Sequence, residues 1–197
     1  MKKILFFIYN KFYKKNTDHA WKEFYGQAIK HEKARQYEEA IKYYEKALEI
    51  NNNLHDACFK IAEFSSCYCF DHLKAIKYYF KAIKIKPKCL DTHTNLIYEF
   101  MDLSKRSHGK HIALKQEEDL YWKAWKYTVG DCDNKKAIKT FKEALNINKK
   151  SVLSFAKIGL IYKDMGDSKE SIKYFTKSIK CYHSLMPRDS ILRLYKE

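Results

Sequence analysis

The chain has 197 residues, with 39 lysine and arginine residues against 24 aspartate and glutamate residues, which gives a formal net charge of +15. Only 5 residues are glycine and 2 are proline, too few for the frequent turns of most β folds and for a glycine-rich phosphate-binding loop. With 46% hydrophobic and 32% charged residues, the composition fits neither a disordered nor a membrane-spanning chain. We therefore expect a soluble, basic and largely helical protein.

Residues 1–18 form a basic and apolar segment at the start of the chain. The apolar run Ile4–Tyr9 is shorter than the ~7–15 residues of a signal-peptide core and the ~18 residues of a membrane span. We expect residues 4–13 to form an amphipathic helix that packs on the residues that follow, with reversible membrane association as the competing expectation. The chain is expected not to be secreted, so its six cysteines are interpreted as reduced thiols and the expected location is cytoplasmic.

Four later segments share one helical pattern. Each carries a small residue, then Ile-Lys, an aromatic residue and a second small residue, at a spacing that falls on one helix face. Because two helices approach closely only where side chains are small, each segment is predicted to be a helix packed on the helix before it. The segments are Tyr37–Leu48, His72–Ile83, Asn134–Leu145 and Ser168–Ile179, and their first small residues are Ala40, Ala75, Ala137 and Ser171.

The last of these segments and the helix before it carry the most specific motif. It reads Phe155-x-x-Ile158-Gly159-x-x-Tyr162, then Gly166-Asp167 at a turn, then Ser171-x-x-x-Phe175. The chain thus resembles the tetratricopeptide repeat family, whose unit is a helix–turn–helix of about 34 residues. The resemblance implies an all-α fold, a right-handed α-solenoid of stacked antiparallel helix pairs, with four to five units over residues 19–184.

The third unit departs from this regular pattern. Ala75 and Ala137 are 62 residues apart, six short of two regular units of about 34. A helix is predicted at Leu90–Leu103 and another near Lys115–Thr128, with a polar, irregular segment near residues 104–115 between them. The sequence leaves open whether this segment contains the second helix of the third unit. Beyond the last unit, residues 185–197 are predicted to form a capping helix.

No catalytic, cofactor-binding or metal-binding constellation is predicted. Cys67, Cys69 and His72 lie close in sequence but lack the paired spacing of structural zinc sites. The three tryptophans are interpreted as core residues and not as a ligand cage. The chain is therefore expected not to be an enzyme and to need no cofactor.

The family resemblance implies a scaffold or adaptor that binds another protein, as a peptide or a helix, in a concave groove lined by the first helices. In the co-chaperone branch, a lysine and an asparagine four residues apart clamp a chaperone's terminal carboxylate. Tyr25 and Ile29 stand at those places, or Phe59 and Glu63 if the clamp began one repeat later. Only Asn95 would fit the pattern, so no binding of this kind is expected. By the same resemblance, the groove residues are Lys22, Tyr25, Ile29, Lys33, Phe59, Lys60, Glu63, Asp91, Asn95, Tyr98, Leu153, Ala156, Lys157 and Leu160.

The alternative is a basic helical protein that binds nucleic acid or an anionic membrane. The chain contains many lysines, but many of them fall on the second helices of the pairs, as Lys42, Lys77 and Lys173 do. On these helices we expect a dispersed, solvent-facing charge. Such a distribution favours solubility over a dedicated binding stripe. Nucleic-acid binding is therefore expected to be at most non-specific.

Overall fold

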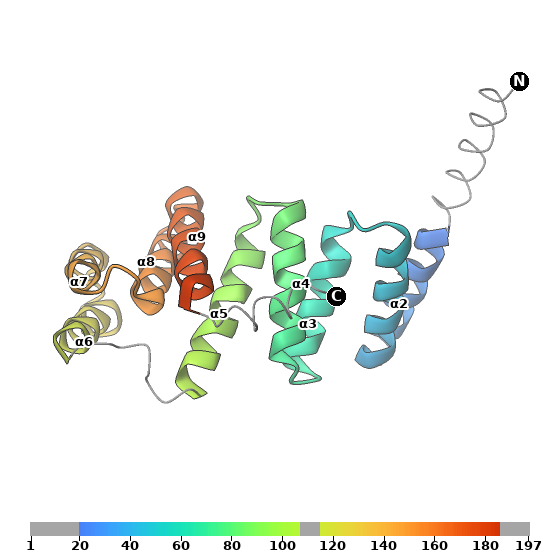
Figure 1. Cartoon of the computed structure of the whole chain (residues 1–197), viewed down its shortest axis with the longest axis horizontal. Helices are drawn as coiled ribbons and strands as arrows, with labels where there is room; N and C mark the ends of the chain where they lie inside the picture. The colour runs from blue at the N-terminus through green and yellow to red at the C-terminus, as the bar shows by residue number, and fades with distance from the viewer. Residues whose placement is uncertain (1–19, 107–114, 186–197) are drawn as a thin grey trace, which may run out of the picture. The chain divides into compact units, whose positions relative to one another are not determined.

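The computed structural model describes residues 20–106 and 115–185, and every regular element within these two ranges is a helix (Figure 1). The predicted all-α fold class is therefore confirmed. The predicted helix over residues 4–13, residues 107–114 of the irregular segment and residues 186–197 of the predicted capping helix lie outside the described residues.

Unit 1 of the chain ends at Pro87 and contains two helix pairs joined by short turns. In the first pair, Phe24 and Tyr25 of the first helix contact Tyr43 and Tyr44 of the second. The second helix then packs against the first helix of the next pair. The helices are residues 20–33, α2 (Tyr37–Ile50), α3 (His55–Cys67) and α4 (His72–Ile85).

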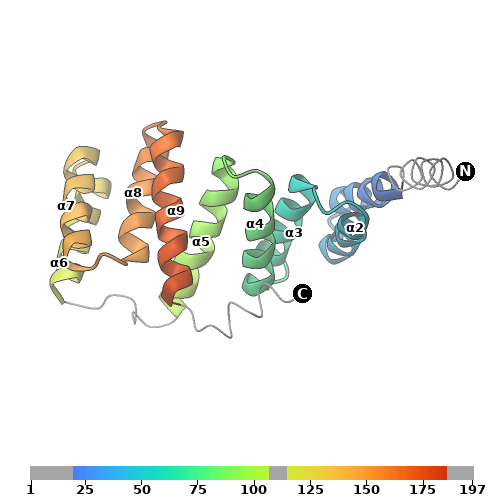
Figure 2. The same cartoon turned by 45° about the horizontal axis from the view of Figure 1, so that its top comes forward.

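Unit 2 begins at Lys88 and departs from stacking in chain order. In it α6 pairs with α7, α8 pairs with α9, and α7 packs against α8, but α5 packs mainly against α9. Both views draw α5 and α9 side by side (Figures 1 and 2), and Phe100 stacks on Tyr182 with 3.8 Å between ring centroids. The helices are α5 (Leu90–Arg106), α6 (Lys115–Val129), α7 (Asn134–Ile147), α8 (Val152–Asp164) and α9 (Ser168–Leu185).

The small residues of the repeated pattern lie where the helices of each unit come closest. The first small residue of every segment has no exposed surface, as the sequence predicts. In α9 the small residues are serines, and their hydroxyls add hydrogen bonds between the helices. Ser171 donates to the carbonyl oxygen of Gly159 and Ser178 to that of Val152, each at 2.8 Å.

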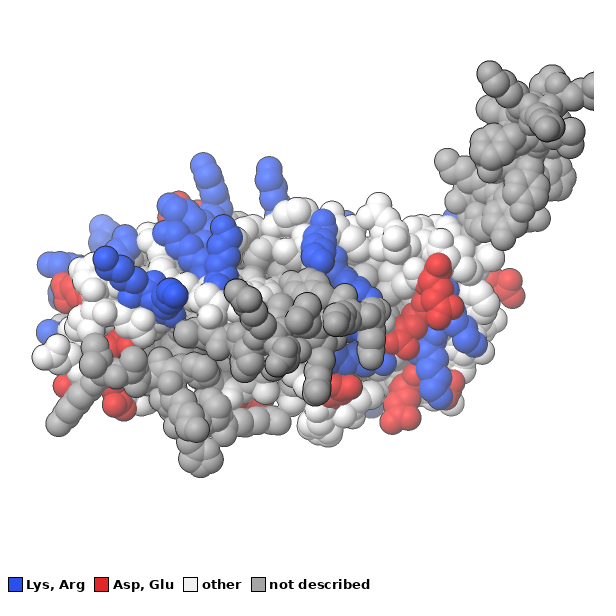
Figure 3. Space-filling view, viewed as in Figure 1, with Lys and Arg blue, Asp and Glu red and all other residues white. Residues whose placement is uncertain are grey.

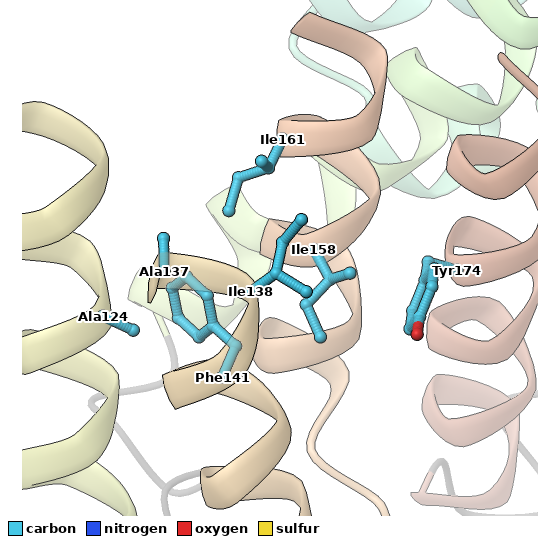
Figure 4. Packing of buried hydrophobic residues seen from close by; sticks show 7 residues of the cluster. All are labelled: Ala124, Ala137, Ile138, Phe141, Ile158, Ile161 and Tyr174. Carbon is cyan, nitrogen blue, oxygen red and sulfur yellow. The ribbon is translucent and has the colours of Figure 1, made fainter. Parts of the chain in front are cut away.

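Helices α6 to α9 enclose one hydrophobic core (Figure 4). Close by, Gly159 lies against the fully buried ring of Phe175, and a Cβ atom at this glycine would come within 2.5 Å of that ring. The close packing of α8 on α9 therefore depends on the absence of a side chain there. The core consists of Ala124, Ala137, Ile138, Phe141, Ile158, Ile161 and Tyr174.

The turn within each described helix pair has one residue in the left-handed region. These residues are Arg35, Phe70, Cys132 and Gly166, with φ angles of 57°, 54°, 50° and 80°. Each precedes the first small residue of its repeat by five positions, so the four turns share one geometry. Only Gly166 adopts this conformation without the steric cost that a Cβ atom brings.

The interpretation of the three tryptophans as core residues is wrong for two of them. Trp122 is 53% exposed and Trp125 is 39% exposed, whereas Ala124 between them is buried. The difference arises because α6 packs chiefly on α7 and receives no comparable cover from α5, the helix before it in the chain.

Candidate functional site

The predicted groove residues of unit 1 come from two helices that are the first members of their pairs. Lys22, Tyr25, Ile29 and Lys33 lie on the helix over residues 20–33, and Phe59, Lys60 and Glu63 lie on α3. The two lysines of the first helix are exposed, and the other five side chains are partly buried. Four of them belong to two neighbouring features: Lys22 and Tyr25 line an open cleft, and Lys60 and Glu63 are part of a charged network.

The cleft has a volume of about 740 Å³. Its walls come from the first helix, the turn between α2 and α3, the start of α3 and the end of α4. Trp21 and Tyr25 meet edge to face at 6.2 Å between ring centroids on one wall. Two predicted residues line the cleft, within the full set of Trp21, Lys22, Tyr25, Gly26, Asn53, Leu54, His55, Asp56, Ile85 and Lys86.

Asp56 gives this cleft a carboxylate between two basic groups. His55 Nδ1 lies 2.8 Å from Asp56 Oδ1, and Lys86 Nζ lies 3.5 Å from the same oxygen. The hydrogen bond with His55 and the charge of Lys86 lower the pKa of Asp56, so it is ionised at neutral pH. Burial and the nearby carboxylates raise the pKa of Tyr25, whose hydroxyl therefore remains a donor.

The charged network lies farther along the same two helices and centres on Lys60. Its ammonium group lies 3.1 Å from Glu32 and 3.0 Å from Glu63. The hydroxyl of Tyr44 donates to the other oxygen of Glu32 at 2.7 Å. Burial lowers the pKa of Lys60, but the two carboxylates outweigh this effect and raise it overall, so the lysine stays charged.

Sequence reasoning missed Glu32, Tyr44 and Asp56 as members of this site. Glu32 follows Tyr25 by seven residues, which is the spacing of one helix face, so extending the periodic pattern by one step would have included it. Tyr44 gives no such signal, because its position in the repeat marks it as a core residue and it is 1% exposed.

The predicted groove residues of unit 2 lie on α5 and α8, which contact each other. Tyr98 is 50% exposed, and Asp91 is exposed as well. Ala156, in contrast, is only 1% exposed and is part of the packed interior. The remaining predicted residues, Asn95, Leu153, Lys157 and Leu160, are partly buried.

Lysines on the second helices form a different kind of surface. Lys42 and Lys173 are exposed, as predicted, whereas Lys77 is partly buried. Others extend over aromatic rings, with Lys46 4.9 Å from the ring centroid of Tyr43. In the view of Figure 3, basic side chains predominate over α8 and α9, whereas both signs of charge mix over α2.

Neither a metal centre nor a membrane-spanning element is found within the described ranges. No group of three or more histidine, cysteine or acidic side chains there is placed to hold a metal ion. None of the described helices combines the length and hydrophobicity that a bilayer-spanning helix requires.

Several solved structures are similar to the chain at low sequence identity. A MamA protein is 18% identical over 86% of this chain and 100% of its own, with a TM-score of 0.44. MamA from Desulfovibrio magneticus RS-1 is 16% identical over 85% and 97%, with a TM-score of 0.42. YrrB, described as a TPR protein with an unusual peptide-binding site, is 15% identical over 88% and 91%, with a TM-score of 0.40. No curated protein was found to match the chain in sequence.

The tetratricopeptide repeat family matches the chain at two places, residues 21–54 and residues 154–180. The first match covers the first helix pair of unit 1, and the second covers most of α8 and α9, the last pair of unit 2. The pairs α3–α4 and α6–α7 between them share the buried small residues of the same repeat pattern. The chain therefore contains tetratricopeptide repeats.

Proposed function

We propose that the protein is a non-catalytic scaffold that binds a peptide or a helix of another protein along the first-helix face of unit 1. Tetratricopeptide repeats in general serve protein–protein interaction, and the finer assignment rests on one observation. The cleft of about 740 Å³ beside Trp21 and Tyr25 lies within the range of about 300–1,000 Å³ typical of ligand sites.

The lining of this cleft indicates what kind of side chain it accepts. Trp21, Tyr25 and Leu54 supply an apolar wall for an aliphatic or aromatic anchor residue of the partner. Lys22 and Lys86 flank that wall with positive charge, and Asp56 adds one acceptor. The proposed partner segment therefore carries an apolar anchor next to an acidic residue.

The charged network beside the cleft would hold the groove in shape before the partner arrives. Lys60 is already fixed between Glu32 and Glu63, so binding does not have to order these long side chains. A preformed site loses less conformational entropy on association. Glu63, whose side chain is 35% exposed, would accept hydrogen bonds from a bound main chain.

A peptide-library screen on the full chain, followed by titration calorimetry of the selected peptide, tests the proposal. Tyr25→Ala should weaken binding at least about tenfold, because truncating an aromatic hot-spot residue costs about 2 kcal/mol or more. Lys46→Glu on α2 is the matched control and should leave affinity nearly unchanged, since this lysine lies on a second helix.

The salt dependence of the binding affinity distinguishes peptide binding in the groove from binding of nucleic acid or anionic lipid by the lysines. A nucleic-acid or anionic-lipid ligand held by lysines would lose affinity steeply with salt, by roughly 0.7–0.9 in log K per phosphate neutralised for each unit of log salt. If Lys46→Glu or the pair Lys77→Glu with Lys81→Glu abolishes binding while Tyr25→Ala does not, the groove assignment is wrong.

A further inference from the structure

Helix α6 presents an apolar stripe that no described helix of its unit covers. Tyr121 and Ala124 face α7, where Tyr121 lies 5.5 Å from Phe141 between ring centroids. The stripe beside them consists of Trp122, Trp125 and Val129, which are 53%, 39% and 61% exposed. Because repeats of a solenoid are stabilised by their neighbours, this is the face that a preceding helix would cover.

The three side chains form one continuous surface. They stand at positions i, i+3 and i+7, so they lie along one side of the helix. The rings of Trp122 and Trp125 meet edge to face at 5.9 Å between centroids. Single exposed apolar residues are common, but adjoining large aromatic residues on a surface mark an interaction site.

The charges on the two sides of Trp122 differ in sign. Glu118 and Asp119 are exposed one turn before it, and Lys123 and Lys126 are exposed within one turn after it. A second copy of α6 laid antiparallel across Trp122 would bring each Lys126 opposite the other copy's acidic pair. A parallel arrangement would place like charges together, and the helix dipoles also favour the antiparallel one.

We propose that the protein forms a two-fold symmetric dimer in which the α6 stripe of one copy packs antiparallel on the α6 stripe of a second copy. Such an interface uses the same residues twice, as an isologous contact does. With one helix from each copy, it falls at or below the low end of the about 1,200–2,000 Å² of stable interfaces, so association is reversible. The dimer would carry two grooves and bind a bivalent partner with increased avidity.

Sedimentation velocity on the full chain between about 1 and 200 μM tests the dimer, because this range brackets micromolar dissociation constants. The wild-type chain should change from monomer to dimer across the range. Trp122→Ser combined with Trp125→Ser should remain monomeric at the highest concentration. Tyr98→Ser, which removes another half-exposed aromatic ring of unit 2, is the control and should dimerise as the wild type does.

Charge exchange tests the antiparallel arrangement separately from folding. Lys126→Glu alone, and Glu118→Lys with Asp119→Lys, should each weaken self-association at least about tenfold through like-charge contacts. An equimolar mixture of these two variants should restore the dimer, because the acidic side chains of one variant then lie opposite the lysines of the other.

Four outcomes would overturn the proposal. A wild-type chain that stays monomeric throughout has no such dimer, and a dimer that survives loss of both tryptophans uses another surface. A mixture that fails to restore association rules out the antiparallel pairing. If the monomer's tryptophan fluorescence shifts to the red when residues 186–197 are removed, the chain's own end covers the stripe and the second copy does not.

Discussion

The two units of this chain apply the same repeat pattern with different results. In unit 1 each helix packs on the next one along the chain, and in unit 2 the helices from α6 to α9 do the same. Helix α5 is the exception, since its chief partner in unit 2 is α9. Three or four residues join the helices within a pair, whereas eight residues separate Arg106 from Lys115.

The length of the connection explains the difference between α5 and the other helices. A short turn constrains the following helix to lie antiparallel beside the previous one. A longer connection removes this constraint, and the apolar face of α5 is then free to pack on another helix. Chain order therefore decides packing only where the turns are short.

The largest expected effect tests the contact that sets α5 apart. Phe100→Ala should lower the free energy of unfolding by about 3–5 kcal/mol, because a ring that is 1% exposed leaves a cavity against Tyr182. Urea denaturation followed by circular dichroism measures this loss. A double-mutant cycle with Tyr182→Ala should give a coupling of about 0.5–1.5 kcal/mol.

Tyr98→Ala on the same helix is the control for this experiment. Its ring is 50% exposed, so the change should stay within about 0.5 kcal/mol. Strict additivity of the Phe100 and Tyr182 variants would show that α5 does not pack on α9 as described.

Alanine substitutions of Gly159 and Gly26 allow helix packing to be compared between the two units. Gly159→Ala should destabilise unit 2 by about 1–3 kcal/mol, because the new Cβ would clash with the ring of Phe175. Gly26→Ala should instead stabilise unit 1 by about 0.5–1 kcal/mol, since nothing lies within 4 Å of the new methyl group and alanine favours the helix. Thermal melts of the two variants should shift in opposite directions, and an unchanged or raised melting temperature of Gly159→Ala would contradict the close packing of α8 on α9.

The turns offer a smaller contrast between the units. Phe70→Gly should stabilise the chain by up to about 1 kcal/mol, because it relieves a left-handed phenylalanine at a φ of 54°. Gly166→Ala at the equivalent turn of unit 2 should cost about 1 kcal/mol, since it introduces that strain. Urea midpoints of the two variants provide the measurement, and a loss of stability in Phe70→Gly would show that its ring has a structural role.

The smallest effect concerns acid sensitivity in unit 2. Burial lowers the pKa of His93, although its hydrogen bond to the Cys89 carbonyl opposes the shift, and burial also lowers the pKa of His183. Both imidazoles are thus more readily neutral in the folded state than in the unfolded state. Their contribution to the free energy of unfolding is complete above the unfolded pKa of about 6.5 and is lost as the pH falls below it.

Unfolding by urea at about pH 7.5 and pH 5.5, on either side of that value, measures this acid sensitivity. The chain should be less stable at the lower pH. His93→Gln combined with His183→Gln should reduce the difference between the two conditions. An undiminished difference would assign the acid sensitivity to other groups.

The amino-acid sequence by itself determined the helix pairs and their register. The buried positions of Ala40, Ala75, Ala137 and Ser171 follow from a pattern that repeats along the chain, and α2, α4, α7 and α9 begin where that pattern begins. This succeeded because helix periodicity and small-residue spacing are local properties, readable within about a dozen residues.

Tertiary structure alone decided the partner of α5, the exposure of Trp122 and the ion pairs of Lys60 with Glu32 and Glu63. An amphipathic stripe specifies that a face will be covered, but the hydrophobic effect has no direction and does not specify by which helix. Ion pairs between helices likewise depend on which residues of two neighbouring helices lie side by side after packing. The sequence therefore settled what each helix is, and packing settled which helices meet.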